Sequence, residues 1–345
     1  MLAQTFLAPN AMKSQRVTTP RANTGEAVLR VDVALTCGTD LKIYRRGHPL
    51  VKPPQILGHE FTGTIVELGK NVKDFKLNDH IVAVNSAPCK RCYYCKNNQR
   101  NLCMTIPQRL LGFSLPGAYA EYIRIPRNIL SQSAYHLPDG VPIEEMALLE
   151  PLACTIQGND ASGLKKGDTI AIIGGGPIGL LHVAVSKAKN AGRVICIDHH
   201  DAKLKLARGF GADLTVATHG AAAVETVREV TEQRGADVVI EATGRPESWV
   251  RAFEMVRNGG TVVFFGGCPT GTVIPFEAGK LHYGSVTLKG SFHHTPKSVK
   301  QAFSLLSQRK IILASLISRR MPLSETGEAL QMMSRGEALK IALTP

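Results

Sequence analysis

The chain has 345 residues, of which 44% are hydrophobic and 20% charged, a composition typical of globular proteins. This length exceeds what one hydrophobic core usually fills, so two domains are expected. The 41 basic and 28 acidic residues give a net charge of +13. The basic residues form no long run, which argues against a nucleic-acid partner.

The N-terminus and the cysteine content favour a cytoplasmic protein. Residues 1–15 lack the basic start and the long apolar core of a signal peptide. No stretch approaches the roughly 20 uninterrupted apolar residues that cross a membrane, so no membrane partner is expected. Eight cysteines in a chain of this length without an export signal do not indicate a disulfide framework.

Period-two alternation dominates the chain up to about residue 150. In residues 30–35 (RVDVAL), apolar valines and leucine alternate with other side chains, and similar short runs recur at 61–68 and 80–84. Glycines and prolines lie between these runs. The pattern predicts an all-β domain of many short strands.

Four closely spaced cysteines follow these strands: Cys89, Cys92, Cys95 and Cys103. The spacing C-x2-C-x2-C-x7-C predicts a closed tetrahedral shell of thiolates, which is typical of a structural zinc site. An iron–sulfur cluster also uses four cysteines, but this spacing and context favour it less. Together with the net charge, the cysteine lobe keeps a zinc-ribbon nucleic-acid-binding protein as a rival function.

From about residue 165, short apolar strands alternate with helix-length stretches. The strands are predicted at 169–173, 194–198, 214–217, 236–240 and 261–266. This alternation is typical of a doubly wound parallel sheet. After about residue 288 a further mixed segment follows without a strong motif.

A glycine-rich turn follows the first of these strands. Gly174, Gly176 and Gly179 fit G-x-G-x-x-G, with Pro177 and Ile178 between the last two glycines. The glycines permit the tight turn, the approach of the backbone to a pyrophosphate and close helix–strand packing. The following helix offers N–H groups to the phosphates. The turn therefore predicts a dinucleotide site.

Asp198 ends the next strand and indicates which dinucleotide binds. A carboxylate there accepts hydrogen bonds from both ribose hydroxyls and repels a 2′-phosphate, which favours NAD over NADP. His199, His200 and Lys203 follow closely enough to weaken that repulsion, and Lys203 is a further candidate cofactor residue. Alternatively, Asp198 only caps the following helix.

Cys37, in Cys37-Gly38-Thr39-Asp40, and His59, in Gly58-His59-Glu60, form a second group of candidate ligands. Each alone would usually be a buried core residue. Together, in a chain that also binds a dinucleotide, they predict two ligands of a catalytic zinc.

The run Gly58-His59-Glu60-x2-Gly63-x5-Gly69-x2-Val72 resembles the zinc alcohol dehydrogenase signature of the medium-chain dehydrogenase/reductase superfamily. With the cysteine lobe, the glycine turn and Glu150-Pro151-Leu152, the resemblance covers essentially the whole chain. It implies a GroES-like β-rich catalytic domain built from both chain ends around an inserted Rossmann domain. The implied parts are residues 1–150, 151–290 and 291–345.

Glu150 makes the chain more similar to the polyol branch (sorbitol, threonine and butanediol dehydrogenases) than to the ethanol-oxidising enzymes. It stands where the ethanol enzymes have a second cysteine ligand. The resemblance implies a catalytic zinc at Cys37 and His59, with Glu60 and Glu150 as alternatives for the acidic ligand. Cys154, Cys196 and Cys268 are expected to be core residues.

The resemblance also implies roles for three residues near Cys37. Thr39 resembles the hydroxyl that relays the alcohol proton outwards, and Asp40 the carboxylate that orients the ligating histidine. Many relatives end the relay with a histidine five residues after the cysteine ligand, and this chain has Lys42 there. The terminal base of the relay therefore stays open.

The implied activity is hydride transfer between a secondary alcohol and NAD, giving the ketone. The implied substrates are small molecules: a polyol, a cyclitol or an amino alcohol, with L-threonine or a sugar-alcohol phosphate as alternatives. Two zinc ions per subunit and a homo-oligomer, a tetramer rather than a dimer, are implied as well. A zinc-free reductase of the same fold would lack the metal ligands that this chain has.

Two basic segments have open interpretations. Arg45, Arg46 and His48 either receive a phosphate or carboxylate of the substrate or form a solvated loop. His293 and His294 either line the substrate pocket or belong to a surface turn.

Overall fold

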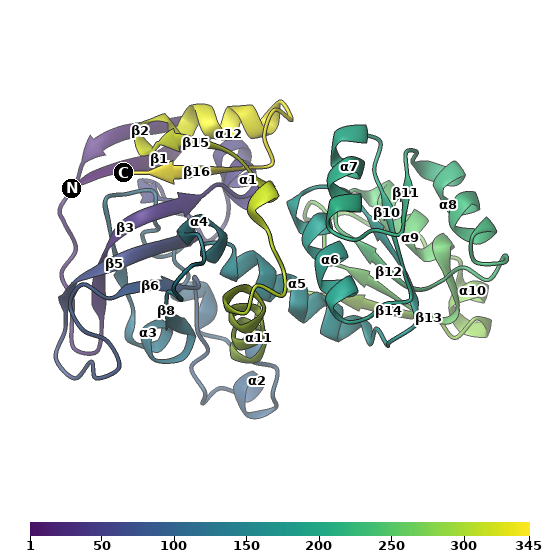
Figure 1. Ribbon diagram of the computed structural model, residues 1–345, viewed down its shortest axis with the longest axis horizontal. Coiled ribbons are helices and arrows are strands. Elements are labelled where there is room, and N and C mark those ends of the chain that lie inside the picture. Colours follow the sequence, from purple (N-terminus) through teal and green to yellow (C-terminus); the bar gives the residue numbers. More distant parts are fainter. The chain divides into compact units, whose positions relative to one another are not determined.

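The computed structural model describes residues 1–345 and consists of two compact units. The first combines Met1–Ala153 with His294–Pro345, and the second is the continuous segment Cys154–His293. Figure 1 shows the purple N-terminal and yellow C-terminal segments side by side within the first unit. None of the helices combines the length and the apolar character that a membrane span requires.

A seven-stranded sheet organises the first unit. Its strand order is β15-β16-β3-β5-β6-β8, and β7 pairs with β3 beside this path. The strands are β3 (Ala27–Leu35), β5 (Glu60–Leu68), β6 (His80–Ala83), β7 (Tyr122–Ile125), β8 (Ala134–His136), β15 (Ile317–Pro322) and β16 (Lys340–Thr344). A smaller sheet has the order β2-β1-β4, with β1 (Leu2–Ala8), β2 (Ala11–Arg16) and β4 (Gln55–Ile56).

The core of this unit joins the two ends of the chain. Leu29 of β3 and Phe61 of β5 are fully buried in one cluster with Ile341 and Leu343 of β16. Strands β3 and β5 approach closely at Gly63, where an added Cβ would lie 2.5 Å from the carbonyl oxygen of Arg30. A side chain at position 63 would therefore force the two central strands apart.

Helices interrupt these strands, which the prediction of an all-β first part missed. They are α1 (Gly38–Arg46), α2 (Tyr93–Lys96), α3 (Arg127–Ser133), α4 (Ile143–Met146), the first residues of α5 (Leu149–Ser162), α11 (Pro296–Ser307) and α12 (Thr326–Ser334). Short 3-10 helices lie at η1 (Arg100–Leu102), η2 (Ile106–Gln108), η3 (Ala314–Leu316) and η4 (Leu323–Glu325). The helices before residue 150 are short, and such elements leave little periodicity in a sequence.

The second unit contains a six-stranded parallel sheet with the order β11-β10-β9-β12-β13-β14. In chain order this is 3-2-1-4-5-6, the doubly wound Rossmann arrangement. The strands are β9 (Thr169–Ile173), β10 (Arg193–Ile197), β11 (Leu214–Val216), β12 (Ala236–Glu241), β13 (Val256–Phe264) and β14 (Thr287–Gly290). The helices are α6 (Pro177–Ala188), α7 (Asp201–Gly209), α8 (Gly220–Glu229), α9 (Pro246–Met255) and α10 (Ala278–Tyr283).

The central strands of this sheet are buried on both faces. β9 and β10 each bury four consecutive residues, the continuous apolar pattern of parallel strands that helices cover on both sides. The strand order reverses between β9 and β12, which pair directly. Ligands of such sheets bind outside the carboxyl ends of the strands at this point.

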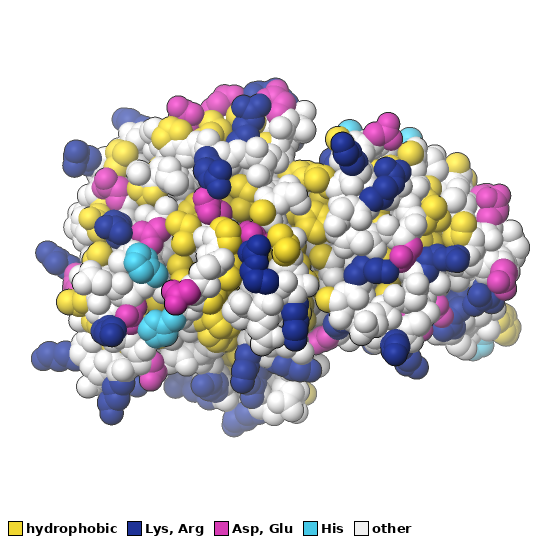
Figure 2. All heavy atoms as spheres, viewed as in Figure 1, with side chains coloured by type: hydrophobic (Ala, Val, Ile, Leu, Met, Phe, Trp, Pro, Cys, Tyr) yellow, Lys and Arg dark blue, Asp and Glu magenta, His cyan; other side chains and the backbone are white.

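Charged side chains are spread over the surface. On the face shown in Figure 2, Lys and Arg side chains lie over both units, with Asp and Glu side chains among them. They form no continuous basic stripe on this face, the feature by which many nucleic-acid-binding proteins are recognised.

Candidate active site and cofactor cavity

Cys37, His59 and Glu60 form the first candidate site. Their ligand atoms all lie within 4.8 Å of one another, and His59 and Glu60 are buried. The pairing of β3 with β5 explains this proximity, because Leu35 is the partner of Glu60 in the ladder. Cys37 follows two residues later as the N-cap of α1.

Asp40 contacts both Cys37 and His59 and holds them in place. Its fully buried carboxylate lies 3.2 Å from Nδ1 of His59 and accepts hydrogen bonds from the Tyr119 hydroxyl at 2.7 Å and the Cys37 N–H at 3.1 Å. Burial by itself would raise the pKa of Asp40, but the attraction of His59 and the hydrogen bonds from His59 and Tyr119 lower it. With Nδ1 engaged, His59 keeps Nε2 for a metal ion.

The donor set of this group fits zinc. A thiolate sulfur, an imidazole nitrogen and a carboxylate oxygen are the ligands that zinc binds in proteins. Three protein ligands also leave a fourth position for a small molecule, which is the arrangement of catalytic rather than structural zinc sites. The geometry around Asp40 therefore supports a catalytic zinc site.

Lys340 is a buried member of this site that the sequence analysis missed. Its ammonium group donates to both carboxylate oxygens of Glu60, at 2.7 Å and 2.5 Å, and to the carbonyl oxygen of Thr36 at 3.1 Å. Burial would lower the pKa of Lys340, but the negative charges of Glu60 and Cys37 raise it. The two charges thus compensate each other in the interior of the unit.

Glu150 lies outside the group of Cys37, His59 and Glu60. At the start of α5, its carboxylate accepts a hydrogen bond from the Asn85 amide at 3.2 Å. The side-chain oxygen Oδ1 of Asn85 lies 3.0 Å from Nε2 of His294. Asn85 is a second residue that the sequence analysis missed, since a single asparagine carries no motif.

The residues of α1 after Cys37 face different surroundings. Thr39 is half-buried, and its backbone N–H donates to the Cys37 sulfur at 3.5 Å, whereas Lys42 is exposed. Arg45 is exposed and donates to the Ser334 hydroxyl.

His48, after the end of α1, lies near His59 through a shared aromatic neighbour. The ring centroid of Phe113 lies 5.5 Å from the ring centroids of both His48 and His59. Burial and the positive charge of Arg46 lower the pKa of His48.

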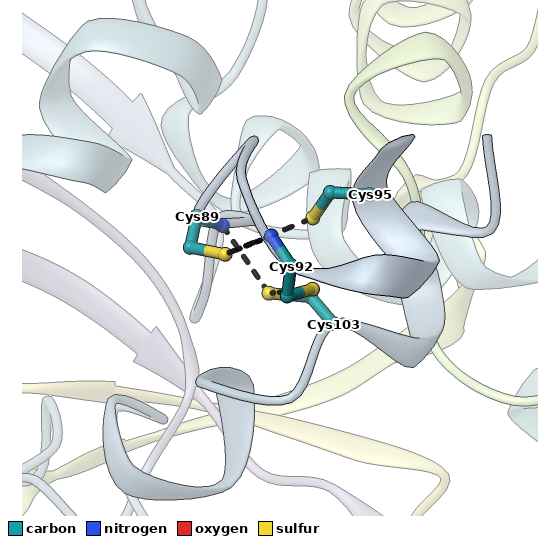
Figure 3. Close-up of side chains that lie close together, drawn as sticks. All are labelled: Cys89, Cys92, Cys95 and Cys103. Atoms are coloured by element: carbon teal, nitrogen blue, oxygen red, sulfur yellow. Dashed lines mark hydrogen bonds between the residues drawn. The ribbon is translucent and has the colours of Figure 1, made fainter. Parts of the chain in front are cut away.

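The four lobe cysteines converge on one point (Figure 3). The sulfur of Cys89 lies 4.0 Å from that of Cys95, and the sulfur of Cys92 lies 3.8 Å from that of Cys103. A tetrahedral zinc–sulfur shell places neighbouring sulfurs about 3.8 Å apart, given its bond length of about 2.3 Å. The four residues therefore fit a closed zinc site.

Backbone N–H groups donate hydrogen bonds to sulfurs of the cysteine lobe. The Cys92 N–H donates to the Cys89 sulfur at 3.3 Å, and the Cys89 N–H to the Cys103 sulfur at 3.2 Å. Burial would raise the pKa of Cys89, but backbone hydrogen bonds from Arg91 and Cys92 lower it to about 6. A thiolate is the form that binds zinc.

A cavity of about 490 Å³ lies at the carboxyl ends of β9, β10 and β12. Gly174 and Gly176 line it, whereas Pro177, Ile178 and Gly179 lie behind them in the first turn of α6. A Cβ at Gly179 would lie 1.6 Å from the carbonyl oxygen of Gly174, so only glycine permits this turn. No side chain caps the N-terminus of α6, and its N–H groups suit a pyrophosphate.

Asp198 and Lys203 both line this cavity. The Asp198 carboxylate accepts hydrogen bonds from the Gly175 N–H at 2.7 Å and the His200 N–H at 2.9 Å, and it lies 3.8 Å from the Lys203 ammonium. Burial would raise the pKa of Asp198, but the bonds from Gly175 and His200 lower it. Asp198 therefore ties the glycine turn to the end of β10.

Models of known protein families match residues in both units of the chain. Residues 23–139 match the alcohol dehydrogenase GroES-like domain, and residues 177–308 match the zinc-binding dehydrogenase family. Sorbitol dehydrogenase of Halalkalibacterium halodurans is 33% identical over 94% of both chains. L-threonine 3-dehydrogenase of Bacillus licheniformis is 29% identical over 94% of this chain and 93% of its own.

Solved structures agree with these relatives. A zinc-binding dehydrogenase of Sinorhizobium meliloti, bound to NADP, superposes with a TM-score of 0.91. It is 30% identical and covers 100% of this chain and 99% of its own. The likeness therefore extends over both units.

Proposed function

This chain belongs to the zinc-binding dehydrogenases, in the branch of the sorbitol and L-threonine dehydrogenases, and we propose that it oxidises a polyol, cyclitol or amino alcohol with NAD. It is a zinc-dependent alcohol dehydrogenase that uses a nicotinamide cofactor. The observation that carries the substrate proposal is the site's acidic character. Glu60 completes the group with Cys37 and His59, and Glu150 is held by Asn85.

Cys37, His59 and Glu60 are the proposed ligands of the catalytic zinc, and the cysteine lobe holds a second zinc. A zinc ion at the first site supplies Lewis acidity that lowers the pKa of a substrate hydroxyl, and the nicotinamide supplies the hydride acceptor. Asp40 fixes the orientation of His59, and Lys340 compensates the charge of Glu60. Glu150 is the alternative acidic ligand.

Glu150 and Asn85 are proposed to recognise the substrate. A carboxylate held by a buried amide is a strong acceptor for a neighbouring hydroxyl or ammonium group. Polyols, cyclitols and amino alcohols have such a group beside the reacting carbon, and ethanol does not. Thr39 takes up the alcohol proton. Lys42, exposed on α1, stands at the solvent end of this proton relay.

NAD is the proposed cofactor. The turn from Gly174 to Gly179 receives the pyrophosphate, and Asp198 accepts hydrogen bonds from the adenosine ribose hydroxyls. Lys203 lies beside Asp198 and contributes to the same end of the cavity.

We also propose that the enzyme is a cytoplasmic homotetramer. Reduced thiols are needed at both zinc sites, which suits a reducing compartment. Closed symmetric assemblies are the usual form of soluble oligomers. Light scattering at micromolar concentration should return about four times the chain mass of 37.2 kDa, and a value near the single chain mass would contradict the assembly.

A substrate panel tests the proposed function. Sorbitol, galactitol, inositols, 2,3-butanediol, L-threonine, a sugar-alcohol phosphate and ethanol are offered with NAD, and the absorbance of NADH is followed. We expect a polyol or cyclitol to exceed ethanol in kcat/KM by at least about 100-fold, or about 2.7 kcal/mol. Ethanol as the best substrate would contradict the proposal. A phosphorylated substrate in first place would assign Arg45, Arg46 and His48 to substrate binding.

A further inference from the structure

Three histidines gather at the end of the cofactor cavity that contains Asp198. His199 follows β10, His200 precedes α7, and His219 precedes α8. The ring centroids of His199 and His200 lie 3.9 Å apart, and those of His199 and His219 lie 5.9 Å apart. All three line the cavity. Segments from two different helix–strand connections thus place titratable rings at one point.

Helix capping does not account for these side chains. His200 and His219 occupy the N-cap positions of α7 and α8, but neither side chain makes a capping hydrogen bond. Histidine is also not among the residues that N-cap positions prefer. The two helix N-termini therefore keep their partial positive charge, which favours an anion in front of them.

The same end of the cavity is rich in permanent charge. Lys203 of α7, Arg245 before α9 and Arg251 of α9 line it, against the carboxylates of Asp198 and Glu247. Arg251 is paired with Glu254 at 2.6 Å, and the Lys203 ammonium lies 3.8 Å from Asp198. Arg245 is exposed. The permanent charges are nearly balanced, so the histidines decide the net charge.

Asp198 is directly coupled to the histidines. One carboxylate oxygen lies 2.8 Å from Nδ1 of His200 and accepts the His200 N–H, and the other accepts the Gly175 N–H. A proton on His200 therefore compensates the charge that would repel a phosphate. Burial and the positive charge of His200 outweigh the attraction of Asp198 and lower the pKa of His199. An anion bound here would reverse that effect and bring a proton with it.

We propose that this end of the cavity also accepts a ribose 2′-phosphate, so that NADP binding gains on NAD binding as the pH falls. The inference rests on the proposed function only in that it places the adenosine ribose beside Asp198. Where the three rings carry no proton, Asp198 favours the free ribose hydroxyl of NAD. Histidine is the side chain whose charge ordinarily changes as the pH falls through the physiological range, and a proton on any of these rings adds positive charge around the position of the phosphate.

The test compares two fragments that differ only in the 2′-phosphate. Binding of 5′-AMP and of adenosine 2′,5′-bisphosphate to the full chain is measured by calorimetry at about pH 8.5 and about pH 6, across the usual histidine range. We expect the affinity ratio of bisphosphate to 5′-AMP to rise at least about tenfold on acidification, or about 1.4 kcal/mol. Calorimetry in buffers of different ionisation enthalpy should show proton uptake with the bisphosphate.

The phosphate itself provides an internal control. Its second pKa is about 6, so acidification reduces its negative charge and, without help from the protein, would weaken binding. In the triple variant His199→Gln/His200→Gln/His219→Gln the ratio should therefore stay level or fall at low pH. His282→Gln is the matched control, because His282 is an exposed histidine of the same unit that does not line the cavity; it should behave as the unaltered chain.

The outcomes separate this inference from the proposed function. If 5′-AMP and NADH bind but the ratio does not rise at low pH, the inference is wrong and the NAD site stands. A rise that persists in the triple glutamine variant also contradicts it. If neither 5′-AMP nor NADH binds at any pH, the proposed cofactor site itself is wrong.

Discussion

The ammonium group of Lys340 lies 2.7 Å and 2.5 Å from the two carboxylate oxygens of Glu60, and both side chains are buried. The last strand of the chain thus compensates the charge of a proposed zinc ligand that begins β5. An isolated charge in this interior would be strongly unfavourable, so the two residues depend on each other.

Lys340→Met should destabilise the first unit by about 3–5 kcal/mol, because it leaves the Glu60 carboxylate buried without its partner. The double variant Lys340→Met/Glu60→Gln removes both charges and should recover part of that loss. Urea denaturation, followed by far-UV circular dichroism, measures the free energy of unfolding of both variants. Lys310→Met, at an exposed position, is the control. A double variant no more stable than Lys340→Met would contradict this account, because neutralising Glu60 would then relieve no unpaired charge.

Asp40→Asn should lower zinc affinity at the Cys37 site by about 10- to 100-fold, since it weakens the hold on Nδ1 of His59. Competition with a chromogenic chelator measures this affinity. Tyr119→Phe removes one hydrogen bond to Asp40 and leaves the carboxylate, so its effect should be smaller. An Asp40→Asn protein with unchanged zinc affinity would show that His59 is oriented without the carboxylate.

Glu150→Ala should lower kcat/KM at least about 100-fold, the range for a lost ligand or a partner of one. Glu150→Gln keeps the shape of the side chain but weakens the acceptor for a substrate hydroxyl. Its kcat/KM should fall between that of the unaltered enzyme and that of Glu150→Ala. Steady-state kinetics with the best polyol decides the matter. Near-normal activity of Glu150→Ala would leave Glu60 as the acidic residue on which turnover depends.

At about pH 8 the enzyme should prefer NAD over NADP at least about tenfold, which needs about 1.4 kcal/mol of discrimination at the ribose. The pKa of Asp198 is lowered, so its carboxylate is charged at this pH and repels a 2′-phosphate. Kinetics with both cofactors measures the ratio, and Asp198→Ala should reduce it. Equal efficiency with both cofactors in the unaltered chain would mean that the neighbouring basic groups already neutralise Asp198.

Local signals in the sequence predicted the Rossmann sheet and the fold class. Strand and helix alternate after residue 165, and the glycine turn spans only six residues. Both signals lie in residues that are close together in the sequence, so the sequence alone reveals them. The ladder between β3 and β5 also brings together Cys37 and His59, which the sequence analysis had paired as ligands because the chain also carries a dinucleotide motif. Lobe cysteines within 15 residues are recognised by spacing alone.

The rest of the site depends on contacts between distant residues. Lys340 and Glu60 are separated by 280 positions, and His294 and Asn85 by 209. A single lysine or asparagine is most often a surface residue, and no periodicity relates it to a partner so far away. Tyr119, which donates to Asp40 from 79 positions away, was missed for the same reason. These pairs can be identified only from the folded structure, which brings the distant residues into contact.

The cysteine lobe should hold one zinc ion independently of the catalytic site. Cys89→Ser opens its tetrahedral shell, so metal analysis should find about one zinc per chain fewer than in the unaltered protein, and the lobe should unfold at a lower temperature. Cys268→Ser is the matched control, because it makes the same change at a cysteine of the second unit outside the lobe. An unchanged zinc content in Cys89→Ser would contradict the structural site.

Stepwise removal of zinc tests the central claim most directly, that oxidation depends on a metal at Cys37, His59 and Glu60. Mild chelation should remove the ion of this open shell first and lower the metal content from about two to about one per chain, because incomplete protein coordination exposes the ion. Oxidation of the polyol should disappear with that ion and return when one equivalent of zinc is added. Full activity after loss of this ion would contradict the account.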